Sequence, residues 1–243
     1  MATTPEATGT AKPEQANGLA TYLKVIYAPG DAFSTLARVP MWGWAAIIGI
    51  LLTLIGTIVL MPATLHYVHA TQEQSLSQMS ADQAATAREA MAKVPQWIYP
   101  LFGVIGSFFA PWIYWLIGAV IFIIGAALSG GDARFKMAWV GAVNSYIIPA
   151  LGSIVSAIIV TLRGPENVNS AADLYALPSL APLAHGSVKL AGFLYGFNIV
   201  NIWFYIIAVI AMEQLLKMSR GAAIITVIVL AVIGAGLAAL FAK

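Results

Sequence analysis

The residues of this sequence whose types could do chemistry are a few polar side chains within long apolar stretches. Asn198, Asn201 and Tyr205 share one side of a helix with Met212 and Glu213. An asparagine in apolar surroundings must face protein or a cavity, because its donors and acceptors otherwise stay unsatisfied. Two hypotheses stay open: hydrogen bonds that hold helices together, or a polar pocket or path between two helices. The candidate residues are Asn144, Tyr146, Pro149, Asn198, Asn201, Tyr205 and Glu213.

Glu213 is the acidic residue nearest to the middle of an apolar stretch, about one turn from its end. Lys217 follows at i+4, in the favourable order for a helical ion pair. We therefore predict that Glu213 pairs with Lys217 or Arg220. Ion-coupled transporters usually keep a charged residue at mid-membrane, so this distribution argues against that class.

His66, His69 and Glu73 are spaced to share one helical face, and His185 falls in a loop that we expect on the same side. Zinc requires three or four such ligands in a fixed geometry. Since no HExxH or carboxylate-rich pattern accompanies them, we favour ordinary interfacial residues and keep metal binding as the alternative. The sequence has no cysteine, P-loop, dinucleotide glycine motif or Ser/His/Asp order. We expect no enzyme, no cofactor and no catalytic residue.

The composition identifies the environment of these residues. Of 243 residues, 12 are Lys or Arg and 10 are Asp or Glu, so 9% are charged, where a soluble domain has about 25%. Apolar residues make up 60%, more than a soluble fold of this size could bury. The composition excludes a soluble globular protein, a disordered chain and a nucleic-acid-binding protein. Apolar runs of about 20 residues predict membrane-spanning helices rather than a β-barrel.

The predicted fold class is all-α, a polytopic bundle of five transmembrane helices preceded by short interfacial amphipathic helices. Residues 1–18 form a disordered tail, 19–40 the interfacial helices, and 41–243 the transmembrane domain. The capping-box spacing of Ser80 and Gln83 predicts a helix in the first outer loop. The predicted spans are about 42–65, 97–128, 137–162, 190–216 and 222–241, with outer loops at 66–96 and 163–189.

Small residues recur at helical spacing in the third and fourth predicted spans, where they would let helix backbones approach closely. The residues are Gly141, Ser145, Gly152, Ser156, Gly192 and Gly196.

The distribution of cations predicts the orientation. Arg134 and Lys136 lie in one very short loop, and Lys217 and Arg220 lie in another, which is where the positive-inside rule is strongest. We predict a cytoplasmic N-terminus and an external C-terminus. In the interfacial region, Leu19, Tyr22, Leu23, Ile26 and Tyr27 share one face of a helix too short to span, which would lie in the plane of the interface.

Several segments together resemble the bacterial branch of the Yip1 family of five-span membrane proteins. They are Tyr27-Ala-Pro-Gly-Asp-Ala-Phe33 with the Pro-Met-Trp that ends at Trp42, Ser145-Tyr-Ile-Ile-Pro149, and Phe197-Asn-Ile-Val-Asn-Ile-Trp203, followed by Ser219-Arg-Gly221 and a last apolar span. The resemblance covers about residues 20–240 and implies a bacterial inner-membrane location.

The resemblance also implies a role like membrane trafficking, because eukaryotic members are linked to vesicle transport and Rab-type GTPases. Their Asp-Leu-Tyr-Gly-Pro motif has only a partial echo here, between Asp173 and Pro178 in an outer loop. The short N-terminal region has no GTPase-binding module, so we do not expect a small GTPase partner.

Three functions follow as hypotheses. The first is a non-enzymatic membrane organiser or scaffold that contacts the lipid bilayer and forms a homo-oligomer. The second is a channel or transporter for a small solute or ion, with a path lined by the third and fourth spans. The third is a lipid-binding or lipid-handling protein.

Overall fold

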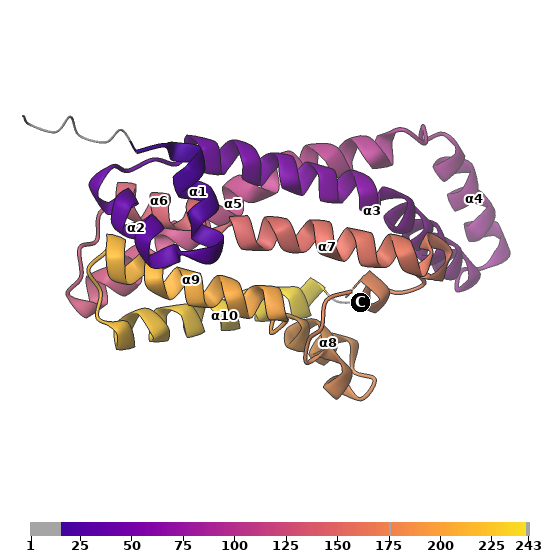
Figure 1. The fold of residues 1–243 in the computed structure, drawn as a ribbon. Coiled ribbons are helices and arrows are strands. Elements are labelled where there is room, and N and C mark those ends of the chain that lie inside the picture. Colours follow the sequence, from indigo (N-terminus) through magenta and orange to yellow (C-terminus); the bar gives the residue numbers. More distant parts are fainter. Residues whose placement is uncertain (1–15, 175, 242–243) are drawn as a thin grey trace, which may run out of the picture.

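The computed structural model describes residues 16–174 and 176–241, so most of the predicted tail lies outside the described residues. The described residues form helices joined by turns and loops, without strands, which confirms the all-α class (Figure 1). Its elements are α1 (Gly18–Tyr27), α2 (Pro29–Arg38), α3 (Gly43–Ser77), α4 (Ala81–Ala92), α5 (Ile98–Ser129), α6 (Phe135–Ser145), α7 (Ile147–Arg163), the 3₁₀ helices η1 (Pro165–Asn167), η2 (Ala171–Leu174) and η3 (Ala181–Ala184), α8 (Val188–Tyr195), α9 (Ile199–Leu215) and α10 (Arg220–Phe241).

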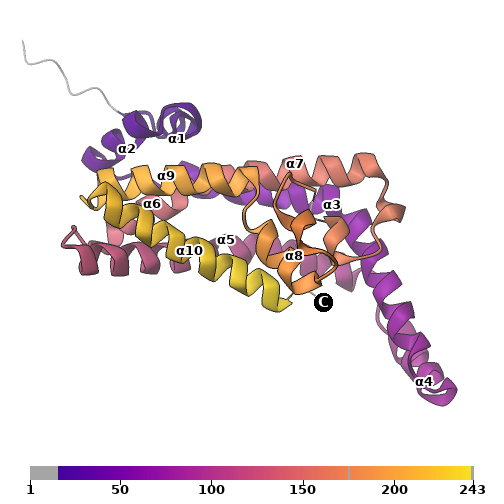
Figure 2. The ribbon, with the colours of Figure 1, turned by 90° about the horizontal axis from the view of Figure 1, so that it is seen from below.

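The long helices α3, α5, α7, α9 and α10 run roughly along one axis (Figure 1). By length and hydropathy, four helices of the described chain can cross a membrane, counting α6 and α7 together, and α8 with α9 makes a fifth if that bent pair is one span. These helices support the predicted multi-span membrane protein. The last part of α3 and all of α4 project from one end of the bundle (Figure 2), and the predicted capping box of Ser80 and Gln83 begins α4.

Two predicted spans contain breaks. The third is interrupted at Tyr146, between α6 and α7. Pro149 lies three residues later, and a proline removes one helical N–H and crowds the carbonyl four residues before it, here that of Ser145. The fourth is interrupted between Tyr195 and Ile199, where α8 and α9 meet at a bend of 45°. Each of these spans was predicted as one continuous helix, so both breaks correct the prediction.

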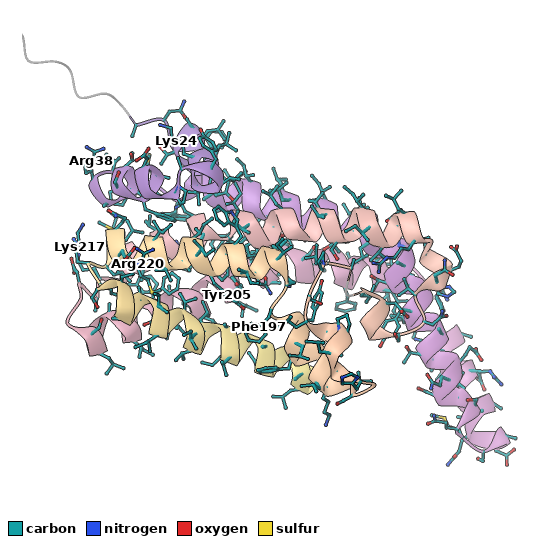
Figure 3. All side chains as sticks on the ribbon, turned by 60° about the horizontal axis from the view of Figure 1, so that its bottom comes forward. Lys24, Arg38, Phe197, Tyr205, Lys217 and Arg220 are labelled. Carbon is teal, nitrogen blue, oxygen red and sulfur yellow. The ribbon has the colours of Figure 1, made fainter. Side chains whose placement is uncertain are left out.

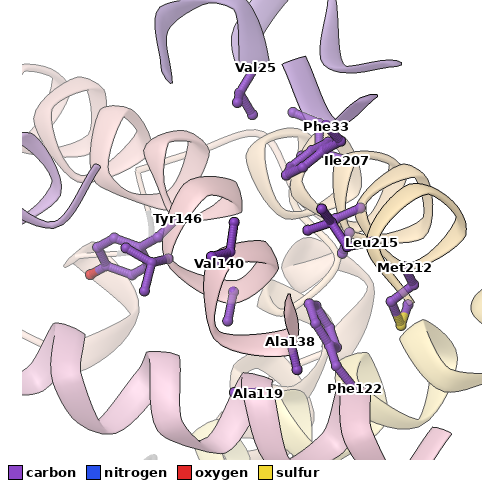
Figure 4. Close-up of a cluster of buried hydrophobic side chains, with 14 of the residues drawn as sticks. Val25, Phe33, Ala119, Phe122, Ala138, Val140, Tyr146, Ile207, Met212 and Leu215 are labelled. Atoms are coloured by element: carbon purple, nitrogen blue, oxygen red, sulfur yellow. The ribbon is translucent and has the colours of Figure 1, made fainter. Parts of the chain in front are cut away.

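The largest cluster of buried side chains joins the N-terminal helices to the bundle (Figure 4). Val25 of α1 and Phe33 of α2 are fully buried together with Val140 of α6 and Ile207 of α9. The single apolar face expected for residues 19–27 therefore divides: Tyr22 faces the protein, whereas another apolar row stays exposed. This outer row consists of Leu19, Leu23 and Tyr27.

Candidate functional site at a helix break

The break between α8 and α9 gathers three of the polar residues predicted in the fourth span, Asn198, Asn201 and Tyr205. Asn198 is the N-cap of α9, and its Oδ1 accepts the N–H of Asn201 at 2.9 Å. Its Nδ2 donates to the Tyr195 carbonyl at 2.9 Å. A carboxamide is suited to this position because it can accept from one helix and donate to the other.

The carbonyl of Gly196 lies inside the same break and accepts two side-chain hydrogen bonds. Asn201 Nδ2 donates to it at 3.0 Å, and the Tyr205 hydroxyl donates at 3.3 Å. Across the break, the Ile199 N–H donates to the carbonyl of Pro178 in the preceding loop, at 3.2 Å. Backbone polar groups at membrane depth must be satisfied inside the protein. These side chains therefore allow the helix to break there.

A hollow of about 310 Å³ lies beside this break, between α3, α7 and the start of α9. Asn198 and Asn201 line it together with three predicted residues of α7, Pro149, Gly152 and Ser156. No Asp, Glu, Lys or Arg is among its described lining residues. Its surface offers hydroxyl and amide groups, which suit a neutral polar molecule or a few waters but supply no charge.

Sequence reasoning missed the contribution of α3 to this hollow. Gly56 and Thr57 of α3 and Ser153 of α7 also line it. A Cβ on Gly56 would lie 2.8 Å from the Ser153 hydroxyl, so α3 and α7 approach closely at this point. The signal was present as the small and polar residues Thr53, Gly56 and Thr57, which recur at helical spacing in an otherwise apolar span.

Two of the predicted polar residues, Asn144 and Tyr146 of the third span, lie elsewhere. Asn144 Nδ2 donates to the carbonyls of Met41 and Val140, each at 2.9 Å, and so ties the segment before α3 to α6. The hydroxyl of Tyr146 lies 3.3 Å from that of Thr53, joining the α6–α7 break to α3. Neither residue lines the hollow.

Glu213 is also separate, near the C-terminal end of α9. Its carboxylate pairs with Arg220 at 3.9 Å, whereas Lys217 Nζ donates to the Gln214 carbonyl. The predicted interfacial ion pair is therefore found with Arg220. Figure 3 shows Lys24, Arg38, Lys217 and Arg220 at the same end of the molecule, which we call the basic end.

The predicted small residues occupy different contacts. A Cβ on Gly152 would lie 2.5 Å from Val200, and one on Gly196 would lie 2.8 Å from Ala235, so these glycines permit close packing of α7 with α9 and of the break with α10. Gly141 faces Leu215 and Phe122 across α9 and α5. Ser156 lines the hollow, Gly192 is buried, and Ser145 is buried with a hydroxyl that makes no hydrogen bond within the described chain.

The predicted histidine face lies in the second half of α3 and forms no metal site with other described residues. The ring of His69 lies 6.5 Å from that of Tyr99, and Glu73 forms an ion pair with Arg88 at 3.3 Å. Within the described residues, no group of three or more His, Asp or Glu side chains is placed to hold a metal ion. His66 and His185 add no further ligand to such a group.

The loop before α8 is ordered locally by Asp173. Its carboxylate accepts hydrogen bonds from the N–H groups of Asn169 and Ser170, at 3.0 and 2.8 Å, and from the Ser170 hydroxyl at 2.9 Å. Burial acts to raise the pKa of Asp173, but these hydrogen bonds and the charge of Arg163 outweigh it and lower the pKa.

Comparison with known proteins agrees with this architecture. The family model of the Yip1 domain matches residues 23–240. Searches of curated proteins and of solved structures found no match. The matched segment begins in α1 and ends in α10, so it covers nearly the same range as the sequence motifs. The resemblance that those motifs indicated is therefore confirmed. The chain belongs to the Yip1 domain family.

Proposed function

We propose that the protein is a non-enzymatic membrane organiser that acts on one leaflet through its N-terminal helices. The observation that carries this proposal is the division of α1 into two faces. Tyr22 and Val25 are 1% and 0% exposed against the bundle, whereas Leu19, Leu23 and Tyr27 are 37%, 44% and 72% exposed. The three exposed side chains follow one another at i, i+4 and i+8, so they form one row along the outside of the helix.

Such a row is suited to insertion at the boundary between headgroups and acyl chains. Fully burying a large apolar side chain contributes about 1.5–3 kcal/mol. Since Phe33 and Leu36 of α2 are buried in the same cluster as Val25, the interfacial helices are held by the bundle. An inserted α1 would then displace lipids at a fixed depth and angle relative to the spans, which is how a rigid wedge shapes or organises a leaflet.

The charge distribution supports an orientation for this proposal. Lys24, Arg38, Lys217 and Arg220 lie at the basic end (Figure 3). Arg134 and Lys136 closely follow Asp132, whose N–H donates to the Leu216 carbonyl beside Lys217. Cations collect on the cytoplasmic side of membrane proteins. We propose that this end faces the cytoplasm of a bacterial inner membrane and that the C-terminus lies outside. On the basis of the family, we also propose that the protein forms a homo-oligomer and has a trafficking-like role. The proposal includes no GTPase partner.

Reconstitution of the full chain into liposomes tests the function. Wild type should convert large vesicles into smaller or tubular ones, scored by electron cryo-microscopy at fixed protein-to-lipid ratio. The variant L19S/L23S/Y27S should lose this effect, because it removes the apolar row while leaving Tyr22 and Val25 in place. The control variant L19I/L23I/Y27F keeps the apolar surface and should behave as wild type. Equal remodelling by the serine variant would contradict the proposal.

A second candidate, a path for a small neutral solute, is favoured by the uncharged polar hollow beside the α8–α9 break. Ser156→Leu places an apolar side chain in that hollow, whereas Val155→Leu, on an exposed position of the same helix, is its matched control. Stopped-flow uptake of glycerol and urea by proteoliposomes distinguishes the candidates. Uptake above that of protein-free liposomes, lost in the Ser156 variant and kept in the control, would replace the organiser as the leading function.

A further inference from the structure

A separate apolar groove runs between α5 and α10, on another part of the molecule from the α1 row. Its volume is about 360 Å³. Leu128, Ser129 and Ala222 line it near one end of these helices, and Ile233 lines it further along α10. A smaller cavity of about 100 Å³ also has Ile233 in its wall, so the hollow surface continues between the two helices.

The floor of the groove is a close helix contact. A Cβ on Gly125 of α5 would collide with the side chain of Thr226 of α10. The Thr226 hydroxyl donates to the Ala222 carbonyl at 2.9 Å, within its own helix. The hydroxyl that α10 contributes to the wall is therefore already hydrogen-bonded, and the wall presents mainly methyl and methylene groups. Such a surface suits a hydrocarbon chain.

The length of the groove matches one leaflet of a bilayer. Ala222 and Ile233 are eleven residues apart on a continuous helix, a distance of about 16 Å at 1.5 Å per residue. Half of a hydrocarbon core of about 30 Å is about 15 Å. A single acyl chain that entered from the Ser129 end would therefore end near mid-membrane.

The end of the groove near Ser129 adjoins two turns that are bonded to each other. The Asp132 N–H, in the turn after α5, donates to the Leu216 carbonyl, in the turn before α10, at 2.6 Å. A Cβ on Gly131 would lie 2.7 Å from the same carbonyl, so glycine allows the turns to meet. This contact holds the two shortest basic loops of the sequence together beside the groove.

Four exposed cations belong to these turns and to the helix starts that follow them. They are Arg134, Lys136, Lys217 and Arg220. Arg134 pairs with Asp132, and Arg220 meets Glu213 only at 3.9 Å. No carboxylate of the described residues lies within ion-pair distance of Lys136 or Lys217. The surface beside the groove thus has an excess of positive charge, which suits an anionic ligand.

We propose that the groove binds one acyl chain of an anionic phospholipid, whose phosphate rests on the two basic turns. The apolar walls fit the chain, the length fits one leaflet, and the cations fit the headgroup. A second copy of this chain fits the site less well. In a parallel dimer about a two-fold axis through this groove, the basic turns of both copies would lie side by side and repel. The site does not depend on the α1 row, so it can fail or hold independently of the proposed function.

Native mass spectrometry of the purified full chain tests the site, with phosphatidylglycerol and phosphatidylcholine titrated separately. K217N/R220Q removes two cations, and asparagine tolerates the left-handed backbone of Lys217, whose φ is 54°. We expect phosphatidylglycerol affinity to fall on the order of tenfold to thirtyfold, with phosphatidylcholine affinity unchanged. The matched control R163Q/K189Q removes two exposed cations from segments away from the basic end and should change neither.

Filling the groove should weaken both lipids together, since both have acyl chains. Val229→Phe does so from an exposed position, and Ile225→Phe is a second variant from the same wall. The melting temperature of each variant shows whether it has folded. The proposal is overturned if a folded groove variant binds both lipids as wild type does, or if the control loses as much phosphatidylglycerol as K217N/R220Q. A groove variant that changes subunit number but not lipid affinity would instead identify a second copy as the occupant.

Discussion

Replacement of Asn198 by alanine should destabilise the protein at the helix break. The side chain caps α9 by accepting the Asn201 N–H and also donates to the Tyr195 carbonyl. An N-cap contributes typically ~1 kcal/mol, and a side-chain hydrogen bond within a membrane averages ~0.6 kcal/mol. From these values, N198A should lower the free energy of unfolding by about 1.5 kcal/mol.

Asn198→Ser is the control that separates the two contributions. A serine hydroxyl still accepts at an N-cap but is too short to reproduce the reach of the carboxamide. N198S should therefore lose only about 0.6 kcal/mol. Reversible unfolding in mixed micelles with increasing dodecyl sulfate, followed by circular dichroism, measures both variants. Amide hydrogen exchange across residues 198–206 should accelerate in N198A more than in N198S.

Most of the expected loss of stability comes from the N-cap, so N198S should be clearly more stable than N198A. If N198S is destabilised as much as N198A, the donated hydrogen bond matters more than the cap. If N198A unfolds at the same detergent fraction as wild type and its amides exchange at the wild-type rate, the hydrogen bonds at this break do not stabilise the fold.

Two further predictions concern packing and pH. Gly152→Ala should lower the free energy of unfolding by about 1–3 kcal/mol, because the new Cβ would crowd Val200. Gly106→Ala, whose Cβ would meet nothing within 4 Å, should raise it by about 0.5–1 kcal/mol. The melting temperatures of the two variants should therefore move in opposite directions, and a shift in the same direction would contradict the close α7–α9 contact. The pKa of Asp173 is lowered in the folded loop, so its stabilisation is present above the unfolded-state value of ~3.9 and is lost as pH falls through the folded value. Opening equilibria from hydrogen exchange at Asn169 and Ser170, corrected for intrinsic rates, should show this loss in wild type and no such pH dependence in Asp173→Asn.

The membrane class and the location of the apolar helices could be predicted because the thickness of the bilayer sets the number of consecutive apolar residues that a crossing helix needs. A run of about 20 apolar residues is required wherever a helix crosses, so the runs themselves reveal the spans. The capping box of Ser80 and Gln83 was predictable for a similar reason, since both partners lie within one turn of chain. Arg220 was among the predicted partners of Glu213 because only a short turn separates the two residues.

The candidate site at the α8–α9 break could not be predicted in full, because it depends on contacts between residues far apart in the sequence. Gly and Asn are tolerated inside membrane helices, so nothing local required Gly196 and Asn198 to mark a break rather than a continuous span. The break is also held by Pro178, which approaches from a loop about twenty residues earlier. The hollow beside it includes Gly56 and Thr57 of α3, about 140 residues away in sequence, and periodicity alone does not identify such partners.

The sequence by itself determined that this is an all-helical membrane protein of the Yip1 domain family, because composition, run length and short motifs are properties of the chain. The tertiary structure decided which polar side chains meet. It placed Tyr22 against the bundle and left Leu19 exposed on the same short helix, and it joined the two basic turns through Asp132 and Leu216. The physical reason is that periodicity in the sequence shows which residues share a face of a helix but does not show what that face contacts. Which face is buried, and which carbonyl needs a donor, depends on the neighbours that packing brings to it.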